Sequence, residues 1–296
     1  MFKGSIVALV TPFTKENKID LEALTKLINW HIDSKTDGIV ICGTTGEGPT
    51  VSDEEKLLML KLAIKHAKDK TKIILNSGTN NTDHSAYLTR KAKEMGADGC
   101  LAVVPYYNKP MPLGIIRHFE AIADEGLPVI LYYHPGRTSI TLSIKTFQEL
   151  QQIKNIVAIK EASGSLDFYK ELMNCINITI LSGDDPLTVD MMKLGAKGVI
   201  SVIANIVPKK WKELTELCLK KDFLEAEKIN DQHKSLIKAV FSETNPQGIK
   251  YAISLLNGCR SFLRLPLIEP DIKNKTLIQN EMKKSDILPR LKPMGF

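Results

Sequence analysis

Short apolar runs recur along most of the chain, and each is followed by a stretch in which apolar residues return every three or four positions. The short runs are rich in β-branched residues and apolar on both faces, which is typical of parallel strands covered by helices. The longer stretches have the period of amphipathic helices, as in LEALTKLINWHID at 21–33. The pattern therefore predicts eight strands alternating with helices: SIVALV (5–10), DGIVIC (37–42), KIILNS (72–77), GCLAVV (99–104), PVILYY (128–133), IVAIK (156–160), ITILSG (178–183) and GVISVI (198–203).

Eight strand–helix units most economically close into a (β/α)8 barrel, so we predict the α/β class with a TIM-barrel topology. An open doubly wound sheet is the alternative, but it would favour a dinucleotide fingerprint after the first strand, where VTPF stands at 10–13. From Pro208 onward the chain has helical patterns only, which indicates a C-terminal helical extension packed on or beside the barrel. We therefore expect a catalytic barrel at 1–224 and a C-terminal helical domain at 225–296.

The carboxyl ends of the strands are where this fold carries its chemistry, because the loops that follow them form the mouth of the barrel. The predicted topology brings hydroxyl groups, one lysine and few acids together at that mouth. The residues are Thr11, Thr44, Thr45, Asn80, Tyr106, Tyr107, Tyr132, Lys160, Gly183, Asp184, Asp185 and Asn205.

A glycine-rich loop, GTTGEGPT at 43–50, follows the second predicted strand. A phosphate-binding Walker loop needs a lysine and a hydroxyl directly after its last glycine, and Pro49 and Thr50 stand there instead. Ser52 and Glu55 form a capping-box pattern that would satisfy the free N–H groups of the next helix. The loop thus favours a neutral carbonyl or a single carboxylate; a turn that merely needs glycine flexibility is the alternative.

Strand alternation in IVAIK places Lys160 on one face with Ile156 and Ala158, and Val157 and Ile159 on the other. The outer face of the barrel must be covered by helices, so the ammonium group fits better in the mouth. Loss of hydration there would lower the lysine pKa from about 10.4 and free the amine to attack a carbonyl. The pattern therefore indicates Schiff-base chemistry; a strand-end lysine paired with the neighbouring acid is the alternative.

Other side chains of the mouth suit such chemistry. Tyr132 ends the fifth strand and Thr44 lies across the mouth, so a phenol and a hydroxyl could relay a proton without a metal. Arg137, in YYHPGR, is a natural fork for a substrate carboxylate. The prolines of PYYNKP hold its two tyrosines in an extended loop. Core tyrosines and a surface salt bridge are the alternatives for these residues.

Composition excludes several other classes of protein. The chain has 296 residues, 43% of them hydrophobic and 25% charged, as in ordinary globular proteins. The net charge of +6 comes from lysines interleaved with acids on predicted helix faces, which argues against nucleic acid as a partner. The N-terminus lacks a signal cleavage site and no apolar run approaches about 18 residues, so we expect a cytoplasmic protein without a membrane partner. Five scattered cysteines and six histidines form no metal-ligand pattern, so we expect free thiols and no metal.

Six ordered motifs resemble those of dihydrodipicolinate synthase: GTTGE (43–47), PYYNKP (105–110), YYHPGRT (132–138), IKEASG (159–164), LSGDD (181–185) and GVISVIAN (198–205). Their order and spacing hold from about residue 3 to residue 265. The resemblance implies a lyase, without a cofactor, that condenses pyruvate with L-aspartate 4-semialdehyde through a lysine Schiff base. The product would be 4-hydroxy-tetrahydrodipicolinate, at the start of diaminopimelate and lysine biosynthesis.

The resemblance also implies a role for each matching residue. Lys160 would be the nucleophile and Tyr132 the acid/base. Thr44 and Tyr107 would complete the proton relay, with Tyr107 entering from a neighbouring subunit of a homotetramer built as a dimer of dimers. The substrate-binding residues would be Thr45 for the pyruvate carboxylate, Arg137 for the semialdehyde carboxylate, and Gly183 and Ile200 along the pocket.

Two features depart from the family pattern. Tyr133 replaces the asparagine that usually follows the catalytic tyrosine, and the register from Pro135 and Arg137 favours Tyr132 as the one that faces the pocket. Members inhibited by lysine carry histidines and a glutamate around the dimer interface. The corresponding effector positions here are Asn80, Tyr106, Asp53, Lys56 and His84. Asn80 and Tyr106 match the pattern of the inhibited members. Asp53, Lys56 and His84 differ from it, which argues against feedback inhibition by lysine.

Two other functions are open on the sequence alone. N-acetylneuraminate lyase and keto-deoxy-sugar aldolases share the lysine and the tyrosine, but they usually have serine in place of Thr44 and lack the equivalent of Arg137. A non-catalytic barrel acting as a binding protein could lose Thr44, Tyr107, Tyr132 or Lys160 without harm to the fold, and all four are present.

Overall fold

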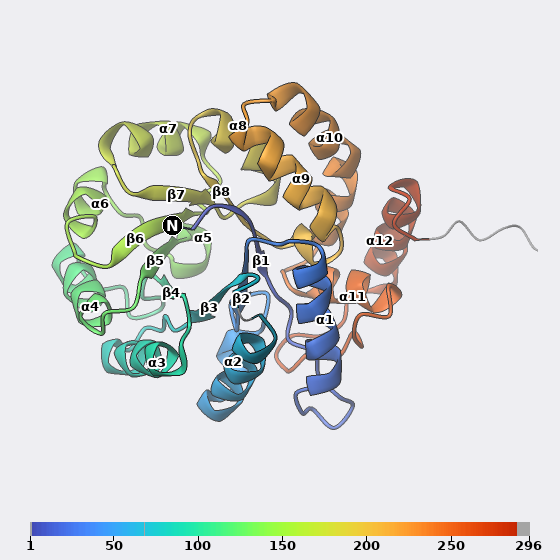
Figure 1. Ribbon diagram of the computed structural model, residues 1–296, viewed down its shortest axis with the longest axis horizontal. Helices are drawn as coiled ribbons and strands as arrows, with labels where there is room; N and C mark the ends of the chain where they lie inside the picture. Colours follow the sequence, from blue (N-terminus) through green and yellow to red (C-terminus); the bar gives the residue numbers. More distant parts are fainter. Residues whose placement is uncertain (1, 68, 289–296) are drawn as a thin grey trace, which may run out of the picture.

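The computed structural model describes residues 2–67 and 69–288, and its centre is a closed barrel of eight parallel strands in chain order (Figure 1). Each strand overlaps the apolar run that predicted it, so the predicted fold class is confirmed. The strands are β1 (Gly4–Ala8), β2 (Gly38–Ile41), β3 (Lys72–Asn76), β4 (Gly99–Val103), β5 (Val129–Tyr133), β6 (Ile156–Glu161), β7 (Thr179–Ser182) and β8 (Gly198–Ser201).

Helices surround the barrel on its outside (Figure 1). The predicted capping box starts α2: the Ser52 N–H donates to the Glu55 carboxylate over 3.0 Å, and the Glu55 N–H donates to Ser52 Oγ over 3.3 Å. The helices that follow the strands are α1 (Leu21–Asp33), α2 (Asp53–Ala67), α3 (Thr82–Met95), α4 (Pro112–Asp124), α5 (Pro135–Thr138), α6 (Ile144–Leu150), α7 (Leu166–Cys175) and α8 (Thr188–Lys193).

The C-terminal part of the chain is helical, as predicted, and lies at one side of the barrel (Figure 1). It consists of α9 (Pro208–Leu219), α10 (Phe223–Val240), α11 (Gln247–Leu255) and α12 (Ile272–Lys284). α9 packs against β1 and α10, and α10, α11 and α12 contact one another. The expected domain boundary after residue 224 falls in the first turn of α10, and residues 289–296 of the expected domain lie outside the described residues. Within the described ranges no helix is long and apolar enough to cross a membrane.

Strand side chains alternate between an inner apolar layer, which fills the barrel, and an outer layer beneath the helices. In β6, Ala158 lies in the inner layer and Ile159 in the outer layer, as predicted. The prediction for Ile156 was wrong, because its side chain packs in the outer layer. Val129 of β5 pairs with Ile156, and the next residue, Ile130, pairs with Ala158. Val157 is therefore an extra residue in a β-bulge, which reverses the alternation at the start of β6.

Candidate active site

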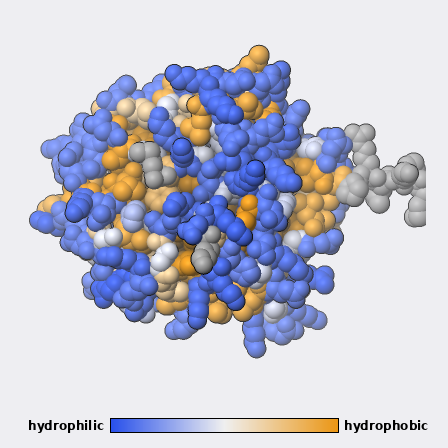
Figure 2. Space-filling view, viewed as in Figure 1, coloured by the Kyte–Doolittle hydropathy of each residue, from blue (hydrophilic) through white to orange (hydrophobic). Residues whose placement is uncertain are grey.

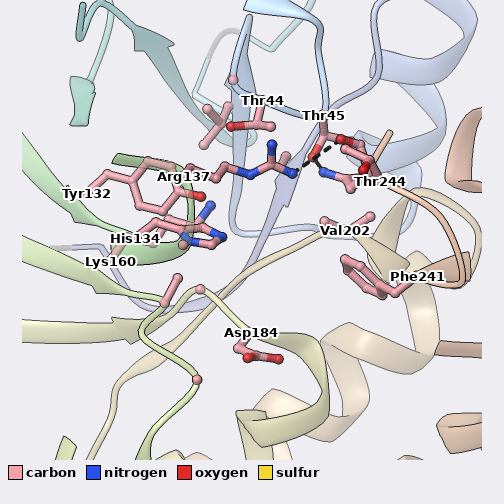
Figure 3. Close-up of a pocket in the computed structure, with 18 of the residues that line it drawn as sticks. Thr44, Thr45, Tyr132, His134, Arg137, Lys160, Asp184, Val202, Phe241 and Thr244 are labelled. Carbon is pink, nitrogen blue, oxygen red and sulfur yellow. Dashed lines mark hydrogen bonds between the residues drawn. The ribbon is translucent and has the colours of Figure 1, made fainter. Parts of the chain in front are cut away.

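A cavity of about 590 Å³ opens at the carboxyl ends of the barrel strands (Figure 3). Tyr132 reaches it from β5, His134 from the loop after β5 and Lys160 from β6. Thr44 and Thr45 lie on the opposite side, after β2 (Figure 3). The fold thus brings six predicted site residues to one cavity: Thr44, Thr45, Tyr132, Arg137, Lys160 and Gly183.

Lys160 lies deep in this cavity and is only 6% exposed. It pairs with Tyr132 across β5 and β6, and its Nζ lies 4.0 Å from the centroid of the Tyr132 ring. Burial lowers the pKa of Lys160 to about 7, although the nearby Asp185 and Asp184 carboxylates act in the opposite direction. A large fraction of this amine is therefore unprotonated, and nucleophilic, near neutral pH.

Gly183 makes room for the lysine. A Cβ atom at this position would lie 2.9 Å from Lys160 Cε and 2.7 Å from the Ala162 side chain, closer than real side chains pack. Any larger residue would displace the nucleophile, so glycine is required by the space and not by the backbone conformation.

Tyr132 is the tyrosine that faces the cavity, as its register predicted. Burial raises the pKa of Tyr132 to about 12, while the Arg137 charge and a hydrogen bond with Thr44 act to lower it. The phenol therefore stays protonated at neutral pH and can donate to a substrate oxygen. Tyr133 points the other way, into the outer layer, where its ring meets the Phe147 ring edge-on at 5.1 Å. The asparagine-to-tyrosine departure thus lies outside the cavity.

Arg137 stands on α5 and its side chain extends toward Thr45 (Figure 3). Its Nη2 donates to the main-chain oxygen of Asn245 over 3.3 Å, and Asn245 Nδ2 donates to Thr45 Oγ1 over 3.0 Å. An arginine fork held in this way can bind a carboxylate with two parallel hydrogen bonds.

Several cavity residues were missed as site residues by the sequence reasoning. Phe241, Glu243, Thr244 and Asn245 come from the segment between α10 and α11 and form one wall. Asn245 and Thr45 are 200 positions apart in the chain, so no local pattern links them. The only sequence signal is Pro246, which interrupts the helical period next to Asn245.

Three placements refine the predicted pocket. Ile200 lies in the inner apolar layer, and it is Val202, two residues later, that lines the cavity. His134 lines it as well, and burial lowers its pKa to about 4, so this imidazole is neutral at pH 7. Asp184 lines the cavity too, and burial raises its pKa to about 6. His134 and Asp184 each directly follow a predicted strand but had no assigned role.

Tyr107 lies away from the cavity of its own chain. It sits in the loop between β4 and α4, its side chain is 89% exposed, and its φ of 71° is a left-handed value that costs a bulky residue energy. An exposed aromatic ring held in a strained loop is available to a neighbouring molecule.

The five candidate effector residues come together beside the first cavity. Lys56, Asn80, His84 and Tyr106 line a second cavity of about 380 Å³, whose walls also include Thr44 and Tyr132. The fifth residue, Asp53, contacts two of them: its carboxylate lies 2.8 Å from His84 Nε2 and 3.5 Å from Lys56 Nζ. Elsewhere, no three His, Cys, Asp or Glu side chains of the described residues are placed to hold a metal ion.

Fold and site together define a (β/α)8 barrel with a buried, partly unprotonated lysine at its mouth, the class that can form Schiff bases with carbonyl compounds. The chain belongs to the dihydrodipicolinate synthetase family, whose family model matches residues 1–285.

Similar proteins agree with this assignment over nearly the whole chain. A 4-hydroxy-tetrahydrodipicolinate synthase of Aquifex aeolicus is 44% identical over 97% of this chain and 99% of its own length. The crystal structure of dihydrodipicolinate synthase from Aquifex aeolicus has a TM-score of 0.95 and 43% identity, covering 98% of this chain and all of the other. The enzyme from Acinetobacter baumannii, solved in complex with pyruvate, has a TM-score of 0.95 and 40% identity, covering 97% of this chain and 100% of its own.

Proposed function

We propose that this protein condenses pyruvate with L-aspartate 4-semialdehyde to give 4-hydroxy-tetrahydrodipicolinate. The observation that carries the proposal is the amine of Lys160, which is buried, has a pKa of about 7 and lies against Tyr132 in a cavity of substrate size. Relatives named 4-hydroxy-tetrahydrodipicolinate synthase support the choice of reaction, because they match 97% of the chain.

The reaction begins when the unprotonated Lys160 amine attacks the carbonyl carbon of pyruvate and water leaves to form an imine. Loss of a methyl proton gives an enamine, whose carbon attacks the aldehyde of the second substrate. The amino group of that substrate then attacks the imine carbon and displaces Lys160, which closes the ring. Overall, one water is released for each product formed.

Proton transfers in these steps need a donor and acceptor at the cavity wall, and Tyr132 with Thr44 fits this role. The phenol is protonated in the resting site and contacts both the lysine and the threonine. It can donate to the leaving hydroxyl and take the proton back at the next step. We assign Thr45 to the pyruvate carboxylate and Arg137 to the semialdehyde carboxylate, since both line the cavity and the Arg137 side chain extends toward Thr45 (Figure 3).

We further propose a cytoplasmic homotetramer, built as a dimer of dimers, in which Tyr107 completes the relay of the neighbouring subunit. Exposed apolar side chains support assembly: Tyr107, Met111 and Leu113 cluster near α4, and Leu265, Ile268 and Ile272 lie at or just before α12. Apolar surface is visible over α12 (Figure 2). The free thiols of all five cysteines fit a reducing compartment.

A direct assay separates this function from its two alternatives. Pyruvate and aspartate semialdehyde are supplied together and product formation is followed through a coupled reductase, with sialic acid cleavage measured on the same sample. We expect turnover in the first assay only. Sialic acid cleavage without condensation would indicate an N-acetylneuraminate lyase. Pyruvate binding without either reaction would indicate a binding protein.

A further inference from the structure

Glu47, the last residue of GTTGE, has a carboxylate with no exposed surface. Lys250 Nζ donates to its Oε1 over 2.5 Å, and the Arg264 N–H donates to its Oε2 over 2.9 Å. Both donors belong to the C-terminal extension, 203 and 217 positions further along the chain. Two hydrogen bonds at this buried carboxylate therefore hold the C-terminal extension against the β2–α2 loop.

Lys250 is as deeply buried as its partner. It stands on α11, none of its side chain is exposed, and its Nζ lies 4.1 Å from the centroid of the Phe13 ring. Burial lowers the pKa of Lys250, and the Glu47 charge opposes that change. A buried pair of this kind adds little net stability, because desolvation of both ions offsets their attraction. The ion pair instead determines geometry, since it fixes the position of α11 relative to the β2–α2 loop.

The loop transmits this constraint to the threonines of the site. The Glu47 N–H donates to the Thr44 carbonyl over 3.0 Å, which closes a tight turn around Thr45. The backbone after this turn is closely packed, because a Cβ atom on Gly48 would lie 2.2 Å from the Cys42 carbonyl oxygen. Asn245, just before α11, holds the Thr45 hydroxyl from the other side. A shift of α11 therefore moves Thr44 and Thr45 together.

We propose that Glu47 and Lys250 are positioning residues, whose ion pair holds Thr44 and Thr45 in the geometry that proton relay and pyruvate binding require. Neither side chain lines the catalytic cavity, so both act through the threonines. The inference rests on the proposed condensation reaction.

The test compares wild type with a Glu47→Gln/Lys250→Met double variant, which removes both charges and keeps an acceptor for the Arg264 N–H. The measurements are kcat, KM for each substrate, and thermal unfolding. We expect kcat to fall at least about tenfold and KM for pyruvate to rise, because small displacements of reacting groups are costly. KM for the semialdehyde should rise less, since Arg137 stands on α5 and only its hydrogen bond to the Asn245 carbonyl depends on α11. A purely structural role would lower the active fraction and leave both KM values unchanged.

A matched control is Glu55→Gln, which weakens the paired hydrogen bonds from Arg264 to Glu55. These bonds join the same extension to α2, outside the turn, so this variant should lose stability and keep wild-type kcat and KM values. Wild-type kinetics in the folded double variant would overturn the proposal.

If the double variant does not fold, Glu47→Asp provides the test. It keeps the charge pair but shortens the link by one methylene, and it should show the same kinetic pattern; wild-type kinetics here would also overturn the proposal. Wild type without condensation activity would instead remove the proposed function itself, so the two failures are distinguishable.

Discussion

Lys160 is reactive because the barrel surrounds its amine with apolar side chains and one aromatic ring. A lysine in water keeps its proton until about pH 10.4, and a buried one loses it earlier because the charged form is poorly solvated. The carboxylates of Asp184 and Asp185 limit this effect without cancelling it. The surroundings of this one residue therefore set the pH range in which the site can work.

The first prediction concerns pH. The unprotonated amine is the reactive form, so kcat/KM for pyruvate should rise about tenfold per pH unit below a midpoint near 7 and then level off. Asp184→Asn should move that midpoint to lower pH, because the lost carboxylate had favoured the ammonium form. A wild-type midpoint above pH 9, or an upward shift in the variant, would contradict this account of the lysine.

The second prediction concerns Arg137. Arg137→Lys keeps the charge and loses the planar fork, so KM for the semialdehyde should rise about tenfold or more while KM for pyruvate stays unchanged. Arg90→Lys is the matched control, because Arg90 makes a similar fork to Glu125 on the surface. Equal changes in both KM values would show that the Arg137 side chain has no specific role in semialdehyde binding.

At the scale of elements, the strands were predictable because apolar runs, helical periods and turn residues depend only on neighbouring positions in the sequence. The bulge at Val157 was not predictable, since it depends on how β6 pairs with β5. The wall formed by Phe241 to Asn245 escaped prediction for the same reason: its contacts with Thr45 and Arg137 join segments far apart in the chain. Lys160, Tyr132 and the threonines were predictable because strand ends share one mouth in this fold. The domain division at residue 224 stays a prediction.

The third prediction concerns the second cavity, which Lys56 of α2 and His84 of α3 help to line. Lys56 presents an ammonium there, and the carboxylate of Asp53 already contacts His84 and Lys56. A bound lysine would place a second ammonium beside the first, so we expect no inhibition when lysine is added to the condensation assay. Lysine inhibition that Lys56→His leaves unchanged would show that this charge does not govern the site.

At the scale of the whole molecule, the site of one chain is incomplete without a partner if Tyr107 acts across an interface. The fourth prediction uses two variants expected to be poorly active, Lys160→Ala and Tyr107→Phe, unfolded together and refolded as a mixture. Random dimers would contain one intact site in half of the molecules, so activity should recover to about a quarter of wild type.

The Lys160→Ala and Tyr107→Phe samples refolded separately are the controls, and both should stay poorly active. A mixture no more active than the average of these controls would show that Tyr107 serves its own chain or takes no part in the reaction.

The central claim is that Lys160 forms a Schiff base with pyruvate, and reductive trapping tests it most directly. The protein is incubated with pyruvate and borohydride, digested, and the modified peptide identified by mass spectrometry. We predict one stable pyruvate adduct, on Lys160, with loss of activity in proportion to labelling, and no adduct at the site in Lys160→Ala. An unlabelled Lys160 in wild-type protein that still condenses the two substrates would contradict the mechanism.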